Sequence, residues 1–461
     1  MPSGPGIDFP PPPCYFYHIS KDRVMLMDNL STVCLLNDSF PPLIDGVVNA
    51  VMNYADALPA AGFSPIVITP DHPQAEDNLL PYPVIRYPSI DFRDKTGGYM
   101  AGIPFSPDIA RQLEGRKIAI LHSHCPIAST ILARELRSIV DAPLVMTYHT
   151  KFDIDIASVV HSRALQTGSK RALVDNISAC DEVWAVSRGA GENLKSLGYE
   201  GDYIVMPNGV DLPRGRVTHE AIASACQGFD LPKDIPVYLF VGRIRWYKGL
   251  RIILEGLAQH KAAGNNFRMV FVGEGSDMEE VRAYASELGI GGQCIYTGAI
   301  RDREGLRAWY CRADLFLFPS TFDTNGLVVR EAAACGLPAV LVRGSCAAED
   351  VTDGRNGFLI AENAESLSSL LARLRPEEIR QVGRNAQAEL YLSWEDAVKN
   401  AAARYEVVID RYRSGLYPVK HRPMEHVLRQ GGELMEDFAR LHDSLRSFGD
   451  KLRDRLDERF L

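Results

Sequence analysis

The chain has 461 residues and a formal net charge of −9, and its composition is 46% hydrophobic and 24% charged. These values are typical of a globular protein, and the length predicts at least two domains. The negative charge argues against nucleic acid as a partner and against a bulk anionic membrane surface.

No stretch approaches the roughly 18 consecutive apolar residues of a membrane-spanning helix. The nine cysteines stand singly, which indicates reduced thiols in a cytoplasmic protein. The N-terminus is rich in proline and lacks the basic-then-apolar design of a secretory signal. Residues 1–30 are therefore expected to form an extension that precedes the fold.

From residue 31 onward, short apolar runs alternate with amphipathic stretches, and this spacing predicts parallel strands joined by helices on both faces of a sheet. A helix is expected at 47–63, after the first strand. A first series of strands is expected at 32–37, 65–69, 117–124, 142–149, 182–187 and 202–208. A second series is expected at 237–242, 269–273, 294–298, 314–319, 339–342 and 357–360.

A polar break between the two series predicts two doubly wound, Rossmann-like α/β domains. We expect a first domain at 31–212, a hinge at 213–234 and a second domain at 235–392. Ser393, which precedes two acidic residues, has the pattern of a helix N-terminus and opens a last segment at 393–461.

The end of that segment has the pattern of an amphipathic helical tail. We expect the tail to pack on the body of the protein or on a second copy of the chain, which would make a homo-oligomer. Peripheral contact with a membrane surface is the alternative, although the near balance of basic and acidic residues weakens it. The apolar residues that recur at helical spacing are Leu434, Phe438, Leu441, Leu445 and Phe448.

Two carboxylates, Asp323 and Glu331, stand around a helix expected at 326–335, just after the strand at 314–319. Ligands bind beyond the carboxyl ends of strands in open parallel sheets. The N–H groups of a helix N-terminus suit a phosphate or a sugar oxygen, and Glu331 could accept two hydrogen bonds from a vicinal diol such as a ribose. The alternative is structural: Asp323 caps the helix and Glu331 complements its dipole.

Two cations follow the first strand of the second series. Arg243 and Lys248 are expected on the loop between that strand and the next helix, again at the ligand-binding end, with Gly242 beside them. Arginine offers planar, forked N–H groups and lysine a point charge, and the two together predict a pocket for a diphosphate. Simple solvation at the surface is the alternative for such a pair.

These segments resemble the retaining nucleotide-sugar glycosyltransferases of family four, which have the two-domain GT-B fold. The resemblance covers about residues 32–415. Its most specific motifs are GRxxxxKG, here Gly242 to Gly249, and two acids with seven residues between them that run into EAxAxGxP, here Asp323 to Pro338. Shorter matches are LIDGVV, HSH, TYHT, VSRG, MPNGVD and FVGEG, and the wording is closest to the branch that glycosylates diacylglycerol-type lipids.

The resemblance implies a role for each matching residue on the side of the nucleotide-sugar. Arg243 and Lys248 would hold the diphosphate and stabilise the leaving group. Glu331 would bind the ribose, Asp323 would bind hydroxyls of the transferred sugar, and His124 would sit near the reacting centre. Contacts through the backbone are expected from Gly46, Gly242, Gly298, Asn325, Gly326, Leu327 and Val328.

The acceptor side is implied in the same way. His149 and Lys151 would line it, the acceptor would be a hydroxyl compound such as a glycolipid or a small molecule, and the helix from Ser393 would cross back to the first domain. The sequence departs from the family pattern at four positions. These are Asp323, where Glu is usual, Asn325, where an aromatic is common, Asp45, where a second glycine is common, and Asn49, where a histidine is common.

The implied reaction is retaining transfer of a hexosyl group from a nucleotide-diphosphate sugar, expected to be a UDP-sugar, with no metal and no cofactor. Asp153 and Asp155 match the DxD metal motif of the other glycosyltransferase fold, but they stand mid-chain, so we interpret the match as incidental. No HExxH or Cys/His spacing indicates a zinc site. Two other functions stay open: a non-catalytic partner subunit related to the transferases, and a nucleotide-sugar epimerase of the same fold.

Overall fold

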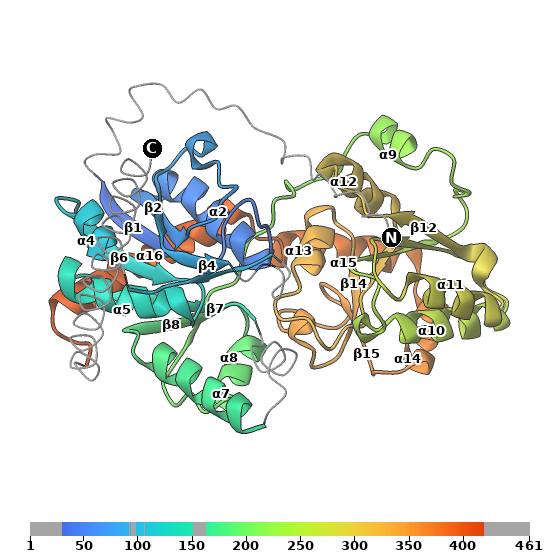
Figure 1. The fold of residues 1–461 in the computed structure, drawn as a ribbon. Coiled ribbons are helices and arrows are strands. Elements are labelled where there is room, and N and C mark those ends of the chain that lie inside the picture. Colours follow the sequence, from blue (N-terminus) through green and yellow to red (C-terminus); the bar gives the residue numbers. More distant parts are fainter. Residues whose placement is uncertain (1–29, 92, 94–97, 106, 151–162, 419–461) are drawn as a thin grey trace, which may run out of the picture.

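The computed structural model describes residues 30–91, 93, 98–105, 107–150 and 163–418, which form two α/β domains lying side by side (Figure 1). The predicted doubly wound α/β fold is confirmed. Three groups of residues singled out in the sequence lie outside the described part: the N-terminal extension, the segment that holds Lys151, Asp153 and Asp155, and the tail from residue 419 onward.

The first domain is built on a seven-stranded parallel sheet in the order β3-β2-β1-β6-β7-β8-β9. Its central strands are almost fully buried because helices cover both faces, which is why they read as continuous apolar runs. The strands are β1 (Ser31–Leu36), β2 (Phe63–Pro70), β3 (Val84–Tyr87), β6 (Ile118–Ser123), β7 (Leu144–Tyr148), β8 (Glu182–Ala185) and β9 (Ile204–Val205), with an antiparallel pair of β4 (Ser89–Asp91) and β5 (Met100–Gly102) beside them. The helices are α2 (Gly46–Ala57), α4 (Pro107–Leu113), α5 (Ala128–Val140), α7 (Arg163–Ser178) and α8 (Arg188–Ser196).

The second domain repeats the design with a six-stranded parallel sheet in the order β12-β11-β10-β13-β14-β15. A single apolar core runs through this sheet and its helices. The strands are β10 (Val237–Val241), β11 (Arg268–Val272), β12 (Cys294–Gly298), β13 (Leu315–Leu317), β14 (Ala339–Val342) and β15 (Phe358–Ile360). The helices are α9 (His219–Ala225), α10 (Leu250–Ala262), α11 (Met278–Glu287), α12 (Arg303–Arg312), α13 (Leu327–Ala334), α14 (Ala364–Arg373) and α15 (Pro376–Glu389).

The strand order reverses once in each sheet, between β1 and β6 in the first domain and between β10 and β13 in the second. The loops that leave these strands diverge there and open a crevice at the carboxyl ends of the strands, which is where doubly wound sheets bind their ligands. The topology therefore selects four loops as the candidate site, two from each domain.

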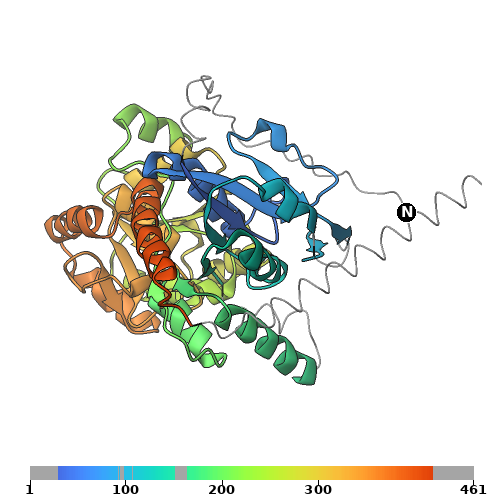
Figure 2. The ribbon, with the colours of Figure 1, turned by 90° about the vertical axis from the view of Figure 1, so that its left-hand side faces the viewer.

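The last described helix, α16 (Trp394–Arg413), returns to the first domain and lies against it (Figure 2). Ser393 caps this helix, since its hydroxyl accepts a hydrogen bond from the N–H of Asp396 at 3.0 Å. The apolar face of α16, including Trp394 and Tyr405, is buried in the core that β1 and α2 share. This helix thus ties the second domain to the first.

The described part of the chain crosses between the domains twice, and the two crossings lie together. Val210 on the first crossing donates its N–H to the carbonyl of Leu392 on the second at 2.9 Å. A β-carbon on Gly209 would lie 2.4 Å from the backbone nitrogen of Trp394, so only glycine allows this approach.

The segment expected to be a hinge, 213–234, carries α9 and packs on the second domain. The N–H of Gly215 donates to the carbonyl of Ala334 at 2.9 Å, and α9 packs on α12. The crossing itself is therefore shorter than the expected hinge and lies just before it. None of the helices in the described parts of the chain is both long enough and apolar enough to cross a membrane.

Candidate active site

The loop after β10 brings Lys248 against Asp323 of the loop after β13. Lys248 lies in a single helical turn (Trp246–Lys248), and its Nζ is 2.8 Å from Oδ2 of Asp323. The side chains are only 14% and 21% exposed, and the ring of Phe318 lies 5.6 Å from the ammonium. The two strands flank the point where the sheet order reverses, so this ion pair sits at the predicted ligand end of the second domain.

Glycines allow the two loops to approach each other. Gly249, directly after Lys248, has φ of +79°, and a β-carbon there would lie 2.2 Å from the carbonyl oxygen of Pro319. A β-carbon on Gly273 would lie 2.0 Å from the carbonyl oxygen of Gly242. Side chains at these positions would push the loop that carries Arg243 and Lys248 away from the end of the sheet.

Asp323 also holds the turn that leads into α13. Its Oδ1 accepts hydrogen bonds from the N–H of Gly326 at 2.9 Å and of Asn325 at 3.3 Å. Burial raises the pKa of the Asp323 carboxyl, but the charge of Lys248 and these N–H groups outweigh it, so the pKa lies below its usual range. The carboxylate is therefore ionised at neutral pH. It accepts hydrogen bonds both from the turn before α13 and from Lys248.

These hydrogen bonds determine which backbone N–H groups near α13 remain able to bind a ligand. The N–H groups of Asn325 and Gly326 were expected to contact the nucleotide-sugar, but Asp323 already accepts from both. Leu327 and Val328 follow them at the helix N-terminus, and their N–H groups have no acceptor within the described part of the chain. These two amides are the ones that α13 leaves available.

Glu331 lies one turn into α13 and is held by two residues of α12. Oε1 accepts from the Arg303 guanidinium at 3.0 Å, and Oε2 accepts from the Tyr310 hydroxyl at 2.8 Å. Each carboxylate oxygen has a second lone pair, so a diol can still be bound. The sequence analysis missed Arg303 and Tyr310, for which the charged start of the helix after Gly298 was the only signal.

Arg243 and Gly298 lie at the ends of β10 and β12, with the end of β11 between them. Arg243 follows β10 and is exposed, with no hydrogen bond or ion pair to any other residue that the structure describes. Gly298 ends β12 with φ of +75°, and the N–H of Ala299 after it points to the carboxylate of Glu274 at 3.4 Å. A guanidinium without a polar partner among the described residues thus lies on the same loop as the paired ammonium of Lys248.

In the first domain, three histidines form a buried cluster where β6 and β7 end. Nδ1 of His124 lies 3.0 Å from Nε2 of His149, and the rings stack with centroids 5.2 Å apart. His122 lies between the Tyr405 hydroxyl of α16, at 2.5 Å, and the Thr147 hydroxyl, at 2.7 Å. Nε2 of His124 is buried and has no hydrogen-bond partner among the described residues, so it is the one imidazole nitrogen of His124 left for a ligand.

Burial keeps this cluster neutral. It lowers the pKa of His149 to about 4, although the charge of Asp45 raises it in part. Burial lowers the pKa of His122 and of His124 well below the usual range, and the neighbouring histidines lower it further. The imidazoles at this edge are therefore hydrogen-bonding groups rather than cations at neutral pH.

The departure at Asp45 has a structural consequence. Its Oδ1 accepts from the N–H groups of Val47 and Val48, both at 2.8 Å, and its Oδ2 accepts from the Tyr99 hydroxyl at 2.9 Å. Asp45 thus caps α2. Although the space around Gly46 is open, a phosphate that approached this helix would meet a carboxylate first.

The carboxyl edges of the two sheets face each other. The Ser187 hydroxyl, after β8, donates to the carbonyl of Thr324, after β13, at 2.5 Å. Thr324 is the neighbour of Asp323, so the loop that carries the ion pair touches the first domain directly. The structure therefore brings the loop of Lys248, Asp323 and α13 together with the ligand end of the first domain.

The histidine cluster makes a prediction about pH. Because the folded-state pKa values lie below those of unfolded histidine, the unfolded chain binds protons first as the pH falls below about 6.5. The free energy of unfolding should fall between pH 6.5 and 5, each buried histidine contributing up to about 1.4 kcal/mol per pH unit. Urea denaturation at several pH values measures this slope, which His149→Gln should reduce and exposed His219→Gln should not. A slope unaffected by His149→Gln would contradict the prediction.

Two family models match the chain, one after the other. "Glycosyltransferase Family 4" matches residues 44–214, and "Glycosyl transferases group 1" matches residues 226–388. Together these matches take in the second sheet, all of the first sheet except β1, and most of the residues described above.

Individual relatives and one solved structure agree with this assignment. The chain is 24% identical over 364 residues to an alpha-monoglucosyldiacylglycerol synthase from Acholeplasma laidlawii, covering 77% of this chain and 91% of that protein. It is 26% identical over 343 residues to a GDP-mannose-dependent alpha-mannosyltransferase from Corynebacterium glutamicum, covering 71% and 76%. The crystal structure of Anabaena HepE in complex with UDP superposes with a TM-score of 0.64 at 18% identity, over 82% of this chain and all of that one, which shows the fold.

Proposed function

Because the chain belongs to the group 1 and family 4 glycosyltransferases, we propose that it transfers a sugar from a nucleotide-diphosphate sugar to a hydroxyl acceptor, retaining the anomeric configuration. One observation carries the proposal. Lys248, paired with Asp323 at 2.8 Å, and unpaired Arg243 stand at the point where the strand order of the second sheet reverses. A diphosphate bound there would lie among two cations and the amides of α13.

The chemistry follows from the charge that develops. As the bond between the anomeric carbon and the phosphate oxygen breaks, the electron pair stays on the leaving diphosphate. Arg243, Lys248 and the N–H groups of Leu327 and Val328 stabilise that charge without reorganising, and each such group contributes several kcal/mol. This clamp is proposed to act without a metal ion, which activity in the presence of EDTA would test.

Retention is assigned to attack on the same face as the leaving group. The acceptor oxygen bonds to the anomeric carbon, and its proton passes to the oxygen of the departing phosphate. Glu331, with its two remaining lone pairs, is assigned to the ribose, and Asp323 to the sugar hydroxyls. His124, whose Nε2 is unpartnered, is assigned to a hydroxyl of the transferred sugar near the reacting centre.

A UDP-sugar and a glycolipid acceptor are the substrates we favour. Support comes from the similarity to a monoglucosyldiacylglycerol synthase and from the fold shared with a UDP-bound structure. His149 and Lys151 are assigned to the acceptor side, and peripheral contact with a membrane would bring a lipid acceptor to that side. The similarity to a GDP-mannose-dependent enzyme makes GDP-mannose the first donor to compare.

One observation favours a second candidate function. Asp45 caps α2 with a carboxylate, where the family commonly has a second glycine, so the first domain repels a phosphate there. Such a chain would keep Arg243 and Lys248 in the second domain but lose the contact between a phosphate and the N-terminus of α2. It could serve as a partner subunit that does not turn over a nucleotide-sugar. Turnover by the purified chain alone separates this function from the transferase.

The first experiment is a thermal-shift comparison of UDP, GDP, ADP and their common sugar conjugates. One nucleotide should raise the melting temperature of the wild type by mass action. The same nucleotide should raise the melting temperature of Lys248→Ala much less. If none of the nucleotides shifts the wild type, the transferase proposal fails and the partner function is preferred.

A further inference from the structure

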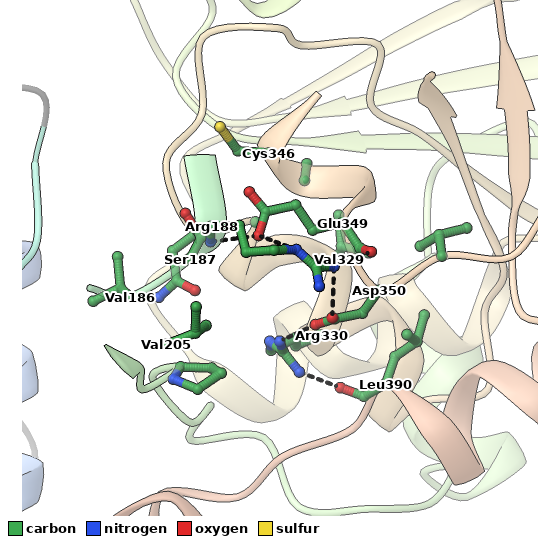
Figure 3. A pocket seen from close by; sticks show the side chains of 15 residues that line it. Val186, Ser187, Arg188, Val205, Val329, Arg330, Cys346, Glu349, Asp350 and Leu390 are labelled. Atoms are coloured by element: carbon green, nitrogen blue, oxygen red, sulfur yellow. Dashed lines mark hydrogen bonds and ion pairs between the residues drawn. The ribbon is translucent and has the colours of Figure 1, made fainter. Parts of the chain in front are cut away.

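A carboxylate of the second domain caps a helix of the first domain. Oε2 of Glu349 accepts from the N–H of Arg188 at 2.6 Å (Figure 3). Its Oε1 accepts from the N–H of Gly189 at 2.5 Å. These are the first two N–H groups of α8, which no carbonyl within the helix can reach. The Glu349 side chain is 17% exposed, so the contact is shielded from water.

The contact continues on both sides of Glu349. The Arg188 guanidinium donates to the backbone carbonyl of Glu349 at 2.9 Å and lies 4.0 Å from the carboxylate of Asp350. Ser187 accepts from the N–H of Ala190 and donates to the carbonyl of Thr324. The N-terminus of α8 is thus bound to the second domain at two separate points, one of them in the loop that carries Asp323.

Gly189 fits this approach and no larger residue does. A β-carbon there would lie 2.2 Å from Sγ of Cys346 and 2.9 Å from Oε1 of Glu349. Its backbone is helical, without the positive φ that would itself require glycine. The close approach of the second domain is the feature that a side chain at this position would disturb.

The surrounding interface is not a continuous apolar contact. A cavity of about 130 Å³ lies beside the hydrogen bonds, and its walls come from both domains, including Pro207 and Val329 (Figure 3). Domains joined by a small and polar interface move relative to one another unless specific contacts hold them. The hydrogen bonds of Glu349 and Ser187 are such contacts.

We propose that Glu349, Ser187 and the N-terminus of α8 form an interdomain latch that holds the donor loop, residues 323–326, in its working position. Glu349 and Ser187 are positioning residues. Ser187 acts on the ion pair of Asp323 and Lys248 through the Thr324 carbonyl, and Glu349 acts on it through the spacing of the domains. The predicted effect on turnover rests on the proposed transferase function. The latch itself does not, because its contacts involve no substrate.

Hydrogen–deuterium exchange of the full chain without ligand tests the latch directly. In Glu349→Gln, the side-chain NH2 group replaces one of the two oxygens that accept hydrogen bonds from the N–H groups of Arg188 and Gly189. One of these hydrogen bonds is therefore lost. Exchange at Arg188 and Gly189 should become about tenfold faster, the scale of a lost hydrogen bond to a charged group. The decisive readout lies across the interface, where exchange in residues 323–328 should also become faster.

Gly189→Ala gives a second route that leaves every polar partner in place. Alanine favours a helix more than glycine does, so α8 itself should not weaken, yet the added methyl group forces the domains apart. Gly168→Ala in α7 is the matched control, since a β-carbon there meets nothing within 4 Å. Gly189→Ala should accelerate exchange in 323–328, and Gly168→Ala should not.

Kinetics then place the latch in the reaction. Glu349→Gln and Gly189→Ala should raise the KM for the nucleotide-sugar about threefold to tenfold, the range that one hydrogen bond supplies. Unchanged exchange in 323–328 in both variants would overturn the latch. Faster exchange in a protein that turns over no nucleotide-sugar would support the latch while contradicting the proposed function.

Discussion

Replacing Arg243 with alanine is expected to lower turnover of the nucleotide-sugar at least about a hundredfold, which is the scale of losing one group that stabilises charge in the transition state. The melting temperature should not change. Arg243 is exposed and makes no hydrogen bond or ion pair with the rest of the described chain, so its removal takes no polar interaction from the folded state. Initial rates of nucleoside diphosphate release, measured beside thermal unfolding, separate the two effects.

Arg245→Ala is the matched control on the same loop. Arg245 is also exposed, but its guanidinium bonds Ser276 and Asp277. Its loss should slightly lower stability and leave turnover close to that of the wild type. If Arg243→Ala kept wild-type turnover, or if both variants lost it equally, a specific role for Arg243 in holding the diphosphate would be ruled out.

Lys248→Ala should also cost about a hundredfold in turnover, and in addition it should destabilise the fold. Its ammonium neutralises the carboxylate of Asp323, which is 21% exposed and would lose its cationic partner. Leaving a buried charge unpaired costs about 1–3 kcal/mol or more of unfolding free energy. Denaturant unfolding and initial rates measure the two losses.

A double variant separates the two roles of this lysine. Lys248→Met with Asp323→Asn removes both charges, so most of the stability should return while turnover stays low. Lys261→Ala, at the far end of α10, removes a lysine that bonds only within the second domain and should affect neither turnover nor the ion pair. Recovery of turnover in the double variant would show that Lys248 acts only by balancing Asp323.

Asp323 has a structural role as well as the ion pair with Lys248. It bonds the N–H groups just before α13 rather than capping the helix, which the structural alternative expected, and it pairs with Lys248 at the ligand end of the sheet. These roles are compatible because a carboxylate has several lone pairs. The N–H groups of Asn325 and Gly326 are therefore already hydrogen-bonded to Asp323. The N–H groups of Leu327 and Val328 are left for a ligand.

The two-domain α/β architecture and the loops that carry the candidate site can be predicted from the sequence. Alternation of apolar runs with amphipathic stretches is a local property, because each strand buried on both faces must be apolar along its whole length. The carboxyl end of each strand follows from chain direction alone. Arg243, Lys248, Asp323 and Glu331 could therefore be assigned to one edge of one sheet without coordinates.

Which of these groups are paired depends on the tertiary structure and could not be predicted from the sequence. Lys248 and Asp323 are 75 residues apart, and Ser187 and Thr324 are 137 apart, so no local pattern relates them. The histidine cluster, the hold of Arg303 on Glu331 and the capping of α8 by Glu349 likewise arise where loops from distant strands converge. Burial and pairing set the charge of a side chain, and both depend on neighbours that the fold supplies rather than on adjacent residues.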